Sequence, residues 1–459
     1  MAYGKDCQLQ ESVIATNTFR NPKRNRLHEI TSRAGWFPYY AGFSVGFVED
    51  VVSHLDLSHG ASLLDPWLGA GTTTQVATAL GLKVRGYDLN PAMLLVARAR
   101  TIPTCAATNI CTLAEAIASS FKKSIQCKRA NSNVEVDPLE QWLQPSSAYT
   151  FRILERAIAA NMLGIERSAT MIPLWRRVGE VSPSLALFYV ALFRSLRHFL
   201  AEFRSSNPTW VKIPHGGKRV QLSPDRLLNR FKREIANLVE LIRAETTTMP
   251  SVSTASCIIE QASSLKLPLA SNSIDAAISS PPYCTRIDYV KATLPELAII
   301  GYPNGQLTRH LREMMIGTPT IVKNQPCNGA RLNNESDTSW GPTCARFLST
   351  VENHSSKASS TYYLKYYRQY FASVFSSLRE IDRVLKKTAP CVIVVQDSYY
   401  KEVPNNLPRV FIEMTTHLGW TLIKQSPFHV KQTLAGVNPG VKPYRKTFHA
   451  IESTLVFSK

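Results

Sequence analysis

The stretch ASLLDPWLGAGTT at residues 61–73, with LKVRGYD at residues 82–88 after it, decides the fold of this chain. A short apolar run of strand type leads into a glycine-bearing loop. A helix of small residues follows the loop, and a second apolar strand ends in the acid Asp88. The order of strand, glycine loop, helix and strand is the first half of a doubly wound sheet. The sequence therefore predicts an α/β fold built on a mostly parallel sheet.

The rest of the sheet is expected in the second half of the chain. The sheet pattern resumes at SNSIDAAISSPPY (271–283), where an apolar strand runs into a Pro-Pro turn. A helix at 366–386 then leads into the strand APCVIVVQDS, and a helix at 407–418 precedes two final strands, WTLIKQSPF and ESTLVFSK. Between these sheet segments, residues about 105–250 have helical periodicity, with FRILERAIAANMLG, LALFYVALFRSLRHFLAEF and PDRLLNRFKREIANLVELI as the clearest helices.

Composition narrows the class of protein. The chain has 459 residues, of which 44% are hydrophobic and 19% charged, so neither general disorder nor a fibrous protein fits. Its 53 Lys and Arg residues outnumber the 34 Asp and Glu residues, and the net charge of +19 favours a polyanionic partner. Nine cysteines lack the spacing of a zinc site, and no uncharged apolar run reaches the roughly 18 residues of a membrane span. We expect a cytoplasmic protein with reduced thiols, no metal and no membrane contact.

The glycine loop has the features of a nucleoside-binding site. Gly69 and Gly71 let the backbone approach a ligand closely, and free amides at the start of the next helix can donate hydrogen bonds. Asp88 closes the next strand, where such sheets hold a pair of ribose hydroxyls. A dinucleotide is disfavoured because the third glycine of GxGxxG is replaced by threonine. The other candidate ligand-binding residues around the loop are Asp65, Thr72, Thr73 and Asn90.

The segment Ser280-Pro281-Pro282-Tyr283 offers the equipment for methylating an amino group. The exocyclic amino nitrogen of a base is a poor nucleophile because its lone pair is delocalised into the ring. An enzyme must accept its hydrogens, stack the base and align it with the methyl donor. Ser280 can accept one hydrogen bond, the carbonyl of Pro281 another, and Tyr283 offers a stacking face, while the two prolines fix the backbone. An isolated SPPY is a rigid turn, but this one follows an apolar strand.

These motifs resemble those of the amino-methylating DNA methyltransferases. DPWLGAGTT resembles the DPFxGxGTT motif of that family, and YDLNP resembles its acid-x-Asn-Pro segment. SSPPYCTRIDYVKATLPELAIIGY resembles the SPPY segment and the helix after it. The likeness covers residues about 34–104 and 258–300, and more loosely 362–459. It implies a seven-stranded class I methyltransferase sheet with a largely helical insertion, and S-adenosylmethionine bound at the glycine loop.

The same resemblance names further residues and one departure. GWFPYYAGFS resembles the aromatic segment that packs against the methionine end of the cofactor, which implicates Tyr40 and Phe43; ordinary core packing is the competing interpretation. The family usually has an acid about twenty positions before SPPY, near the adenine of the cofactor. This chain has Gln261 there, preceded by Glu260, and departs from the family pattern at that place.

The resemblance implies transfer of a methyl group from S-adenosylmethionine to the amino group of a DNA base. SPPY is associated more with cytosine N4, the preferred target, and DPPY more with adenine N6. Adenine N6 methylation, RNA amino-methylation and a catalytically silent DNA-binding or complex-forming protein remain alternatives. Methylation of cytosine carbon-5 is disfavoured because neither Pro326-Cys327 nor Pro390-Cys391 lies in the expected Pro-Cys-Gln form. A restriction-modification or defence role, with a partner nuclease or defence-system proteins, is compatible with this activity.

The expected parts of the chain are four. Residues 1–33 form a basic N-terminal arm, 34–104 the first part of the catalytic domain, 105–250 a helical insertion for nucleic acid or target recognition, and 251–459 the second part, with a long loop at about 315–360. DNA is the expected partner, double-stranded with the target base flipped. The expected phosphate contacts are Lys212, Lys218 and Arg219.

Overall fold

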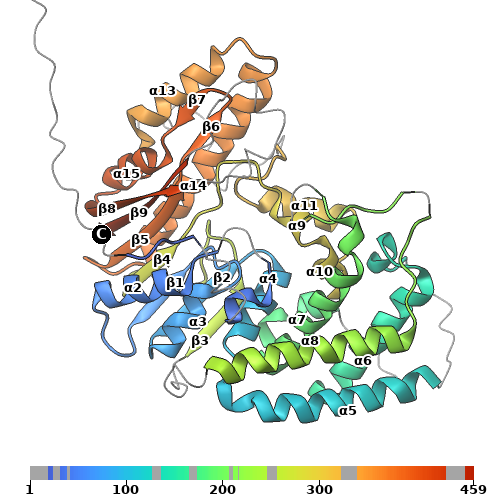
Figure 1. The fold of residues 1–459 in the computed structure, drawn as a ribbon. Coiled ribbons are helices and arrows are strands. Elements are labelled where there is room, and N and C mark those ends of the chain that lie inside the picture. The colour runs from blue at the N-terminus through green and yellow to red at the C-terminus, as the bar shows by residue number, and fades with distance from the viewer. Residues whose placement is uncertain are drawn as a thin grey trace, which may run out of the picture.

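The computed structural model describes residues 19–23, 32–38, 42–126, 136–164, 173–205, 210–215, 217–245, 256–321, 339–430 and 450–459. Its centre is a seven-stranded sheet in the order β3-β2-β1-β4-β5-β9-β8 (Figure 1). Neighbours from β3 to β5 run parallel, and β9 is antiparallel to both β5 and β8. The strands are β1 (Ser62–Asp65), β2 (Lys83–Asp88), β3 (Cys257–Gln261), β4 (Ala276–Ser279), β5 (Pro390–Gln396), β8 (Thr421–Val430) and β9 (Ala450–Ser458). This is the strand arrangement of the class I methyltransferase sheet, so the expected fold class is confirmed.

Successive side chains of each strand point to opposite faces of the sheet, and an apolar layer covers each face. On one face Leu63 and Ile278 pack with the helices α2 (Val45–Leu55) and α3 (Thr72–Ala79). On the other face Leu64 and Ile393 pack with α13 (Gly341–Glu352), α14 (Leu364–Val384) and α15 (Leu407–His417). The central strands are therefore buried on both faces, as expected for parallel strands.

A third apolar cluster lies beyond the β3 edge and forms a helical lobe of α5 (Ala107–Gln126), α6 (Pro145–Leu163), α7 (Pro183–Phe199) and α8 (Pro224–Glu245) (Figure 1). The helix α4 (Pro91–Arg100), which follows β2, packs on α7 and joins the lobe to the sheet. The apolar run from Leu185 to Phe193 is buried along its whole length at the centre of this cluster. Among the described residues no helix is long and apolar enough to cross a membrane.

The segment expected as a long loop at 315–360 is only partly a loop. Residues 341–352 form α13, because Cys344, Phe347, Leu348 and Val351 recur at helical spacing and are buried. A five-residue π-helix, Ser359–Tyr363, then leads directly into α14. The expectation failed here because the polar residues on both sides obscured the apolar stripe; residues 322–338 lie outside the described part of the chain.

The remaining elements connect these layers. After β4 come α9 (Tyr289–Ala292), α10 (Leu294–Ile299) and α11 (Gln306–Met314). A small hairpin of β6 (Ser398–Tyr400) and β7 (Val403–Asn405) follows β5. The chain leaves the sheet at the end of β2, builds the helical lobe, and returns to the neighbouring strand β3.

Candidate active site

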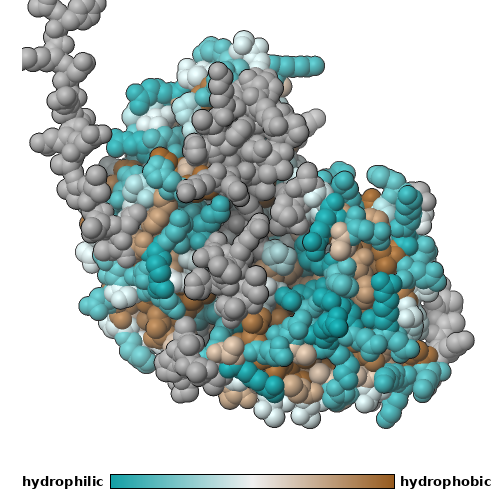
Figure 2. All heavy atoms as spheres, in the orientation of Figure 1, coloured by the Kyte–Doolittle hydropathy of each residue, from teal (hydrophilic) through white to brown (hydrophobic). Residues whose placement is uncertain are grey.

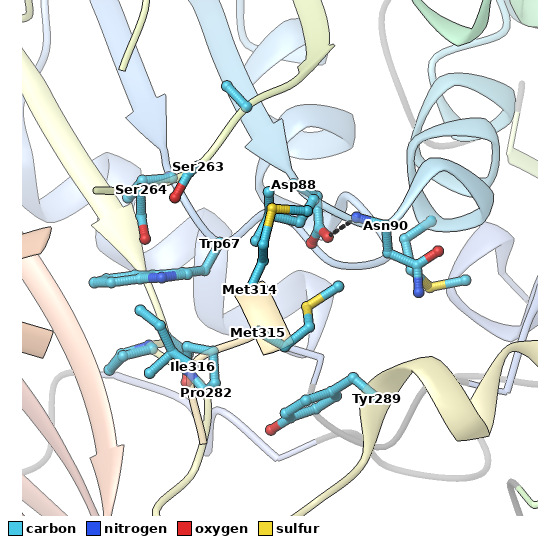
Figure 3. A pocket seen from close by; sticks show the side chains of 16 residues that line it. Trp67, Asp88, Asn90, Ser263, Ser264, Pro282, Tyr289, Met314, Met315 and Ile316 are labelled. Carbon is cyan, nitrogen blue, oxygen red and sulfur yellow. Dashed lines mark hydrogen bonds between the residues drawn. The ribbon is translucent and has the colours of Figure 1, made fainter. Parts of the chain in front are cut away.

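One pocket opens at the carboxyl edge of the sheet, by which we mean the carboxyl ends of β3, β2, β1 and β4. It holds about 690 Å³ of space, part of which is open to solvent. Ligands of open α/β sheets bind at this edge. Figure 3 shows its lining side chains directed inward from several elements. The lining residues are Pro66, Trp67, Asp88, Leu89, Asn90, Met93, Ala262, Ser263, Ser264, Ser280, Pro281, Pro282, Tyr289, Met314, Met315 and Ile316.

Asp88 lies at the end of β2 and lines the pocket. Its Oδ2 accepts a hydrogen bond from the Gly69 amide at 2.8 Å, and its Oδ1 accepts one from the Asn90 amide at 2.8 Å. Burial raises the pKa of this carboxyl, and the backbone donors act against that rise. A carboxylate has about four acceptor positions, so each oxygen keeps capacity for a further donor such as a ribose hydroxyl.

The glycine loop fixes how closely α3 approaches α4. Gly71 is the N-cap of α3 and has a φ of 77°, a conformation that side chains rarely adopt. A Cβ at this position would lie 2.5 Å from the Cβ of Ala97 on α4. Glycine is therefore required here for the backbone conformation and for helix packing. Gly69 and Gly71 do not line the pocket themselves.

A second buried carboxyl ties β1 to β4. Asp65 is 2% exposed, and its Oδ1 accepts a 2.5 Å hydrogen bond from Ser279 Oγ and a 3.3 Å bond from the Trp67 amide. Burial raises the pKa of Asp65 to about 6, with the donors from Ser279, Thr73 and Trp67 opposing the rise. Within the described residues neither Asp65 nor Asp88 is ion-paired with a cation. The carboxyl edge thus holds two carboxyl groups by neutral donors alone.

The SPPY segment divides between the pocket and its rim. Ser280, Pro281 and Pro282 line the pocket, and Ser280 Oγ donates to the Val394 carbonyl at 2.9 Å. That bond uses the hydroxyl hydrogen and leaves the oxygen's lone pairs as acceptors. Tyr283 is not among the lining residues: its phenol donates to Glu452 Oε1 at 2.8 Å. Its predicted stacking role stays a prediction.

Tyr289 lines the pocket instead, although the sequence did not single it out. Its ring lies at the pocket beside Pro282 and Met315 (Figure 3). Its hydroxyl accepts a hydrogen bond from the Tyr283 amide at 3.2 Å, which fixes the ring relative to the SPPY turn. A tyrosine six positions after SPPY, at the start of the next helix, was the available signal.

The two halves of the site are joined by a buried side-chain bond. Asn90 caps α4, and its Nδ2 donates to Thr293 Oγ1 at 2.8 Å, although the two residues are 203 positions apart. This bond fixes the position of the cofactor motif relative to the helices that follow the SPPY turn. Asp88 and Asn90 of the cofactor motif thus line the same pocket as Ser280, Pro281 and Pro282 of the SPPY turn.

Other predicted residues lie near the pocket without lining it. Phe43 packs against Phe47 at a ring distance of 5.2 Å in the apolar layer under the sheet, which agrees with ordinary core packing. Thr72 donates to the Phe43 carbonyl at 3.4 Å, and Thr73 is buried near Asp65. Tyr40 lies outside the described residues.

The end of β3, where the resembled family has an acid, carries Gln261 in this chain. Gln261 is exposed and its Nε2 donates to the Leu89 carbonyl at 2.8 Å, beside the pocket. The pocket wall after β3 is made by Ala262, Ser263 and Ser264. Ser263 and Ser264 follow the third strand of the carboxyl edge, and that position alone could have drawn attention to them.

The lining fits a nucleoside-containing ligand with an apolar and a polar end. Asp88 supplies acceptors for a hydroxyl pair, the indole of Trp67 and Met93 supply apolar surface for a ring, and Ser263 supplies a hydroxyl. Trp67 Nε1 is a buried donor without a hydrogen-bond partner among the described residues. S-adenosylmethionine has the matching parts: a ribose, an adenine and a charged amino-acid end.

The comparisons with known proteins agree with this geometry. Over 329 residues the chain is 23% identical to the type II methyltransferase M.BsoBI of Geobacillus stearothermophilus. The chain is similar to a methyltransferase. The match covers 66% of this chain and 60% of the relative, so the chain spans less than two thirds of the relative's length. The resemblance expected from the motifs is thereby confirmed, and the methyl donor that it implies is S-adenosylmethionine.

Two further comparisons add little. No known protein-family profile matches the chain. A solved structure, the rRNA methyltransferase aviRa from Streptomyces viridochromogenes, aligns with 12% identity over 96% of both chains. Its TM-score of 0.29 is too low to support a conclusion.

Two groups of cations in the helical lobe differ in their partners. Arg194, Arg197 and Arg230 pair with the buried carboxylates of Glu234 and Glu296 and so stabilise the fold. Lys212, Lys218 and Arg219, the predicted phosphate contacts, are exposed. The Lys212 carbonyl accepts from Trp142 Nε1 at 3.2 Å, and nearby Trp210 stacks under Lys291 of α9 at 4.3 Å. The loop that carries Lys212 thus lies against the helix that follows the SPPY segment. Figure 2 shows hydrophilic residues over much of the lobe surface.

Proposed function

We propose that this chain transfers a methyl group from S-adenosylmethionine to the exocyclic amino group of a DNA base, with cytosine N4 as the preferred target. One observation carries the proposal: a single pocket is lined both by Asp88 and Asn90 of the cofactor motif and by Ser280, Pro281 and Pro282 of the SPPY turn. The similarity to a type II methyltransferase supports the same reaction class.

The residues of the turn act on the amino group. Ser280 Oγ and the Pro281 carbonyl accept its two hydrogens, which draws the nitrogen toward a tetrahedral geometry and exposes its lone pair. When bound, S-adenosylmethionine supplies a methyl group whose bond to sulfur breaks, with the electron pair staying on sulfur, as the bond to nitrogen forms. The surplus proton leaves the nitrogen along one of these hydrogen bonds to solvent. Pro281 and Pro282 keep the turn rigid, so the acceptors are in place before the base arrives.

The base must leave the double helix to reach this pocket. We assign its stacking partners to the aromatic groups of the SPPY turn region, Tyr289 at the pocket and Tyr283 at its rim. Lys212, Lys218 and Arg219 are proposed to contact the phosphates of the bound DNA. Arg194 and Arg197 of α7 and Arg230 of α8 already pair with buried glutamates, so we assign them no phosphate contact.

The test measures methyl transfer from labelled S-adenosylmethionine to duplex DNA, followed by mass spectrometry of the nucleosides. We expect N4-methylcytosine. Ser280→Ala should lower kcat about 100-fold, the order found when one hydrogen bond to a transition state is removed, and should leave cofactor binding unchanged because Ser280 Oγ bonds only the Val394 carbonyl among the described residues.

Ser273→Ala is the matched control. Ser273 Oγ also donates to a backbone carbonyl, that of Ala270 at 2.7 Å, but lies at the opposite end of β4 from the pocket. It should retain wild-type kcat. Full activity of the Ser280 variant would refute the assignment of the turn, and N6-methyladenine as the product would replace the proposed base.

A further inference from the structure

The loop from Tyr283 to Tyr289 is closed by a hydrogen bond between its two ends and carries the cation Arg286 at its middle. The Tyr283 amide and the Tyr289 hydroxyl are hydrogen-bonded at 3.2 Å, so the two ends of the loop meet beside the pocket. Arg286 lies halfway between them and is exposed. Since four residues of extended chain span at most about 14 Å, Arg286 is within that distance of Pro282 in the pocket wall.

Arg286 is held rigidly by phenols. Its guanidinium stacks over the rings of Tyr362 and Tyr363, at 5.3 and 5.1 Å, and its Nη1 donates to the Tyr363 hydroxyl at 3.2 Å. Its own amide donates to the Tyr366 hydroxyl at 3.2 Å. A side chain stacked in this way has lost much of its rotamer freedom before any ligand binds, which lowers the entropic cost of binding.

The local backbone is unusual on both sides of this contact. Arg286 has a φ of 60°, in the left-handed region that non-glycine residues rarely adopt. Tyr362 and Tyr363 belong to the π-helix Ser359–Tyr363, a conformation found often at functional sites. Strain of this kind persists where the surrounding structure imposes it, and it gathers at binding sites.

Arg286 also differs from the arginines that the fold holds through an ion pair. Arg152, Arg194, Arg197 and Arg312 are each bound to a carboxylate. Among the described residues Arg286 has only phenolic partners, so its positive charge is not neutralised.

We propose that Arg286 binds a backbone phosphate of the nucleic acid, close to the nucleotide whose base enters the pocket. The inference rests on the proposed function, because it assigns a contact for the same substrate. The exposed guanidinium presents its remaining N–H donors to the phosphate oxygens, and the two tyrosines keep it at a fixed distance from the SPPY turn. This contact positions the strand and reads no base.

The experiment measures the affinity of the full chain for a duplex DNA oligonucleotide at several salt concentrations. Each phosphate contact contributes about 0.9 to the slope of log K against log salt for duplex DNA. Arg286→Gln should lower this slope by about 1 and weaken binding by a similar factor for duplexes of different sequence, with unchanged binding of S-adenosylmethionine. Arg286→Lys keeps the charge and should keep most of the slope.

Arg176→Gln is the matched control, because Arg176 is an exposed arginine stacked on an aromatic ring, that of Trp175 at 5.1 Å, in the segment before α7. It removes the same charge and should leave the slope unchanged. The proposal is overturned if Arg286→Gln keeps the wild-type slope, or if both variants lose the same amount. A thermal unfolding scan checks that each variant is folded, and Arg286→Met, which also removes the charge, carries the test if the glutamine variant is not. Failure of the wild type to bind DNA at all would instead refute the proposed function.

Discussion

The helical lobe and the carboxyl edge of the sheet treat buried charge in opposite ways. In the lobe, Glu234 is 1% exposed and bound by Arg194 and Arg230, and Glu296 is 0% exposed and bound by Arg197. At the carboxyl edge, Asp65 and Asp88 are held by hydroxyl and amide donors. Charges of the lobe are satisfied within the fold. At the edge, Asp88 lines the pocket and keeps acceptor positions for a ligand, whereas Asp65 is buried and does not line it.

Under the proposed function, this difference separates residues that stabilise the fold from residues at the site of methyl transfer. A buried ion pair is costly to break because the remaining charge has no partner. A carboxyl group that is hydrogen-bonded only to uncharged donors can still change its protonation state. A raised pKa of such a group is a frequent sign of a functional site. Three pairs of variants test whether the two regions differ in this way.

The largest effect is expected for Glu296→Ala. Arg197 binds Glu296 at 2.5 and 2.9 Å and joins α7 to α10, so the variant leaves a buried guanidinium without its carboxylate. The free energy of unfolding should fall by about 3–5 kcal/mol, measured by urea denaturation at constant m-value.

Glu180→Ala removes the carboxylate of an exposed pair, Arg177–Glu180, with side-chain exposures of 39% and 67%. It should cost about 1 kcal/mol or less. Equal losses in the free energy of unfolding for Glu296→Ala and Glu180→Ala would show that the buried ion pairs of the lobe contribute no more to stability than an exposed pair.

The same glycine substitution in the two regions should give unequal effects. Gly71→Ala strains a φ of 77° and drives a Cβ into Ala97, so we expect a loss of about 2–4 kcal/mol of stability from the two effects together. Gly164→Ala at the end of α6 has a φ of 64°, and the added Cβ would meet no atom of the described residues within 4 Å apart from its chain neighbours, so only the backbone strain of about 1–2 kcal/mol applies. S-adenosylmethionine binding, measured by calorimetry, should fall for the first variant alone; if both lose it, the glycine loop has no special role.

The smallest effect is a pH dependence. The folded pKa of Asp65, about 6, lies above the unfolded value near 3.8 because burial favours the neutral form. Its contribution to stability is therefore complete below about pH 4 and is lost as pH rises to about 6. Asp65→Asn should become more stable relative to wild type across that window, by at most about 1.4 kcal/mol per pH unit.

Asp275→Asn gives the opposite sign. Its pKa is lowered to about 2, where burial is outweighed by hydrogen bonds from Lys386 and Ser62, so its contribution is lost only as pH falls below about 4. Between pH 4 and 6 its stability relative to wild type should stay constant. A flat profile for Asp65→Asn as well would mean that this carboxyl group is not held neutral by burial.

The sequence was sufficient to predict the site residues that lie at the carboxyl ends of sheet strands. Asp88 and SPPY both follow apolar strands, and the carboxyl ends of parallel strands share one edge, so their meeting in one pocket was predictable. Tyr289 and Met315 reach the pocket from helices and loops, whose placement depends on tertiary packing. The pairing of Arg197 with Glu296, 99 positions away, was invisible for the same reason.

The lobe leaves the sheet after β2 and re-enters at its neighbour β3. The entropy cost of closing such an excursion grows only with the logarithm of its length. The register between these strands, from Val84 opposite Cys257 to Asp88 opposite Gln261, is set by the strands themselves. A longer lobe would therefore cost little entropy and leave the register of β2 against β3 unchanged, whereas a different lobe would also have to supply a partner for the buried carboxylate of Glu296.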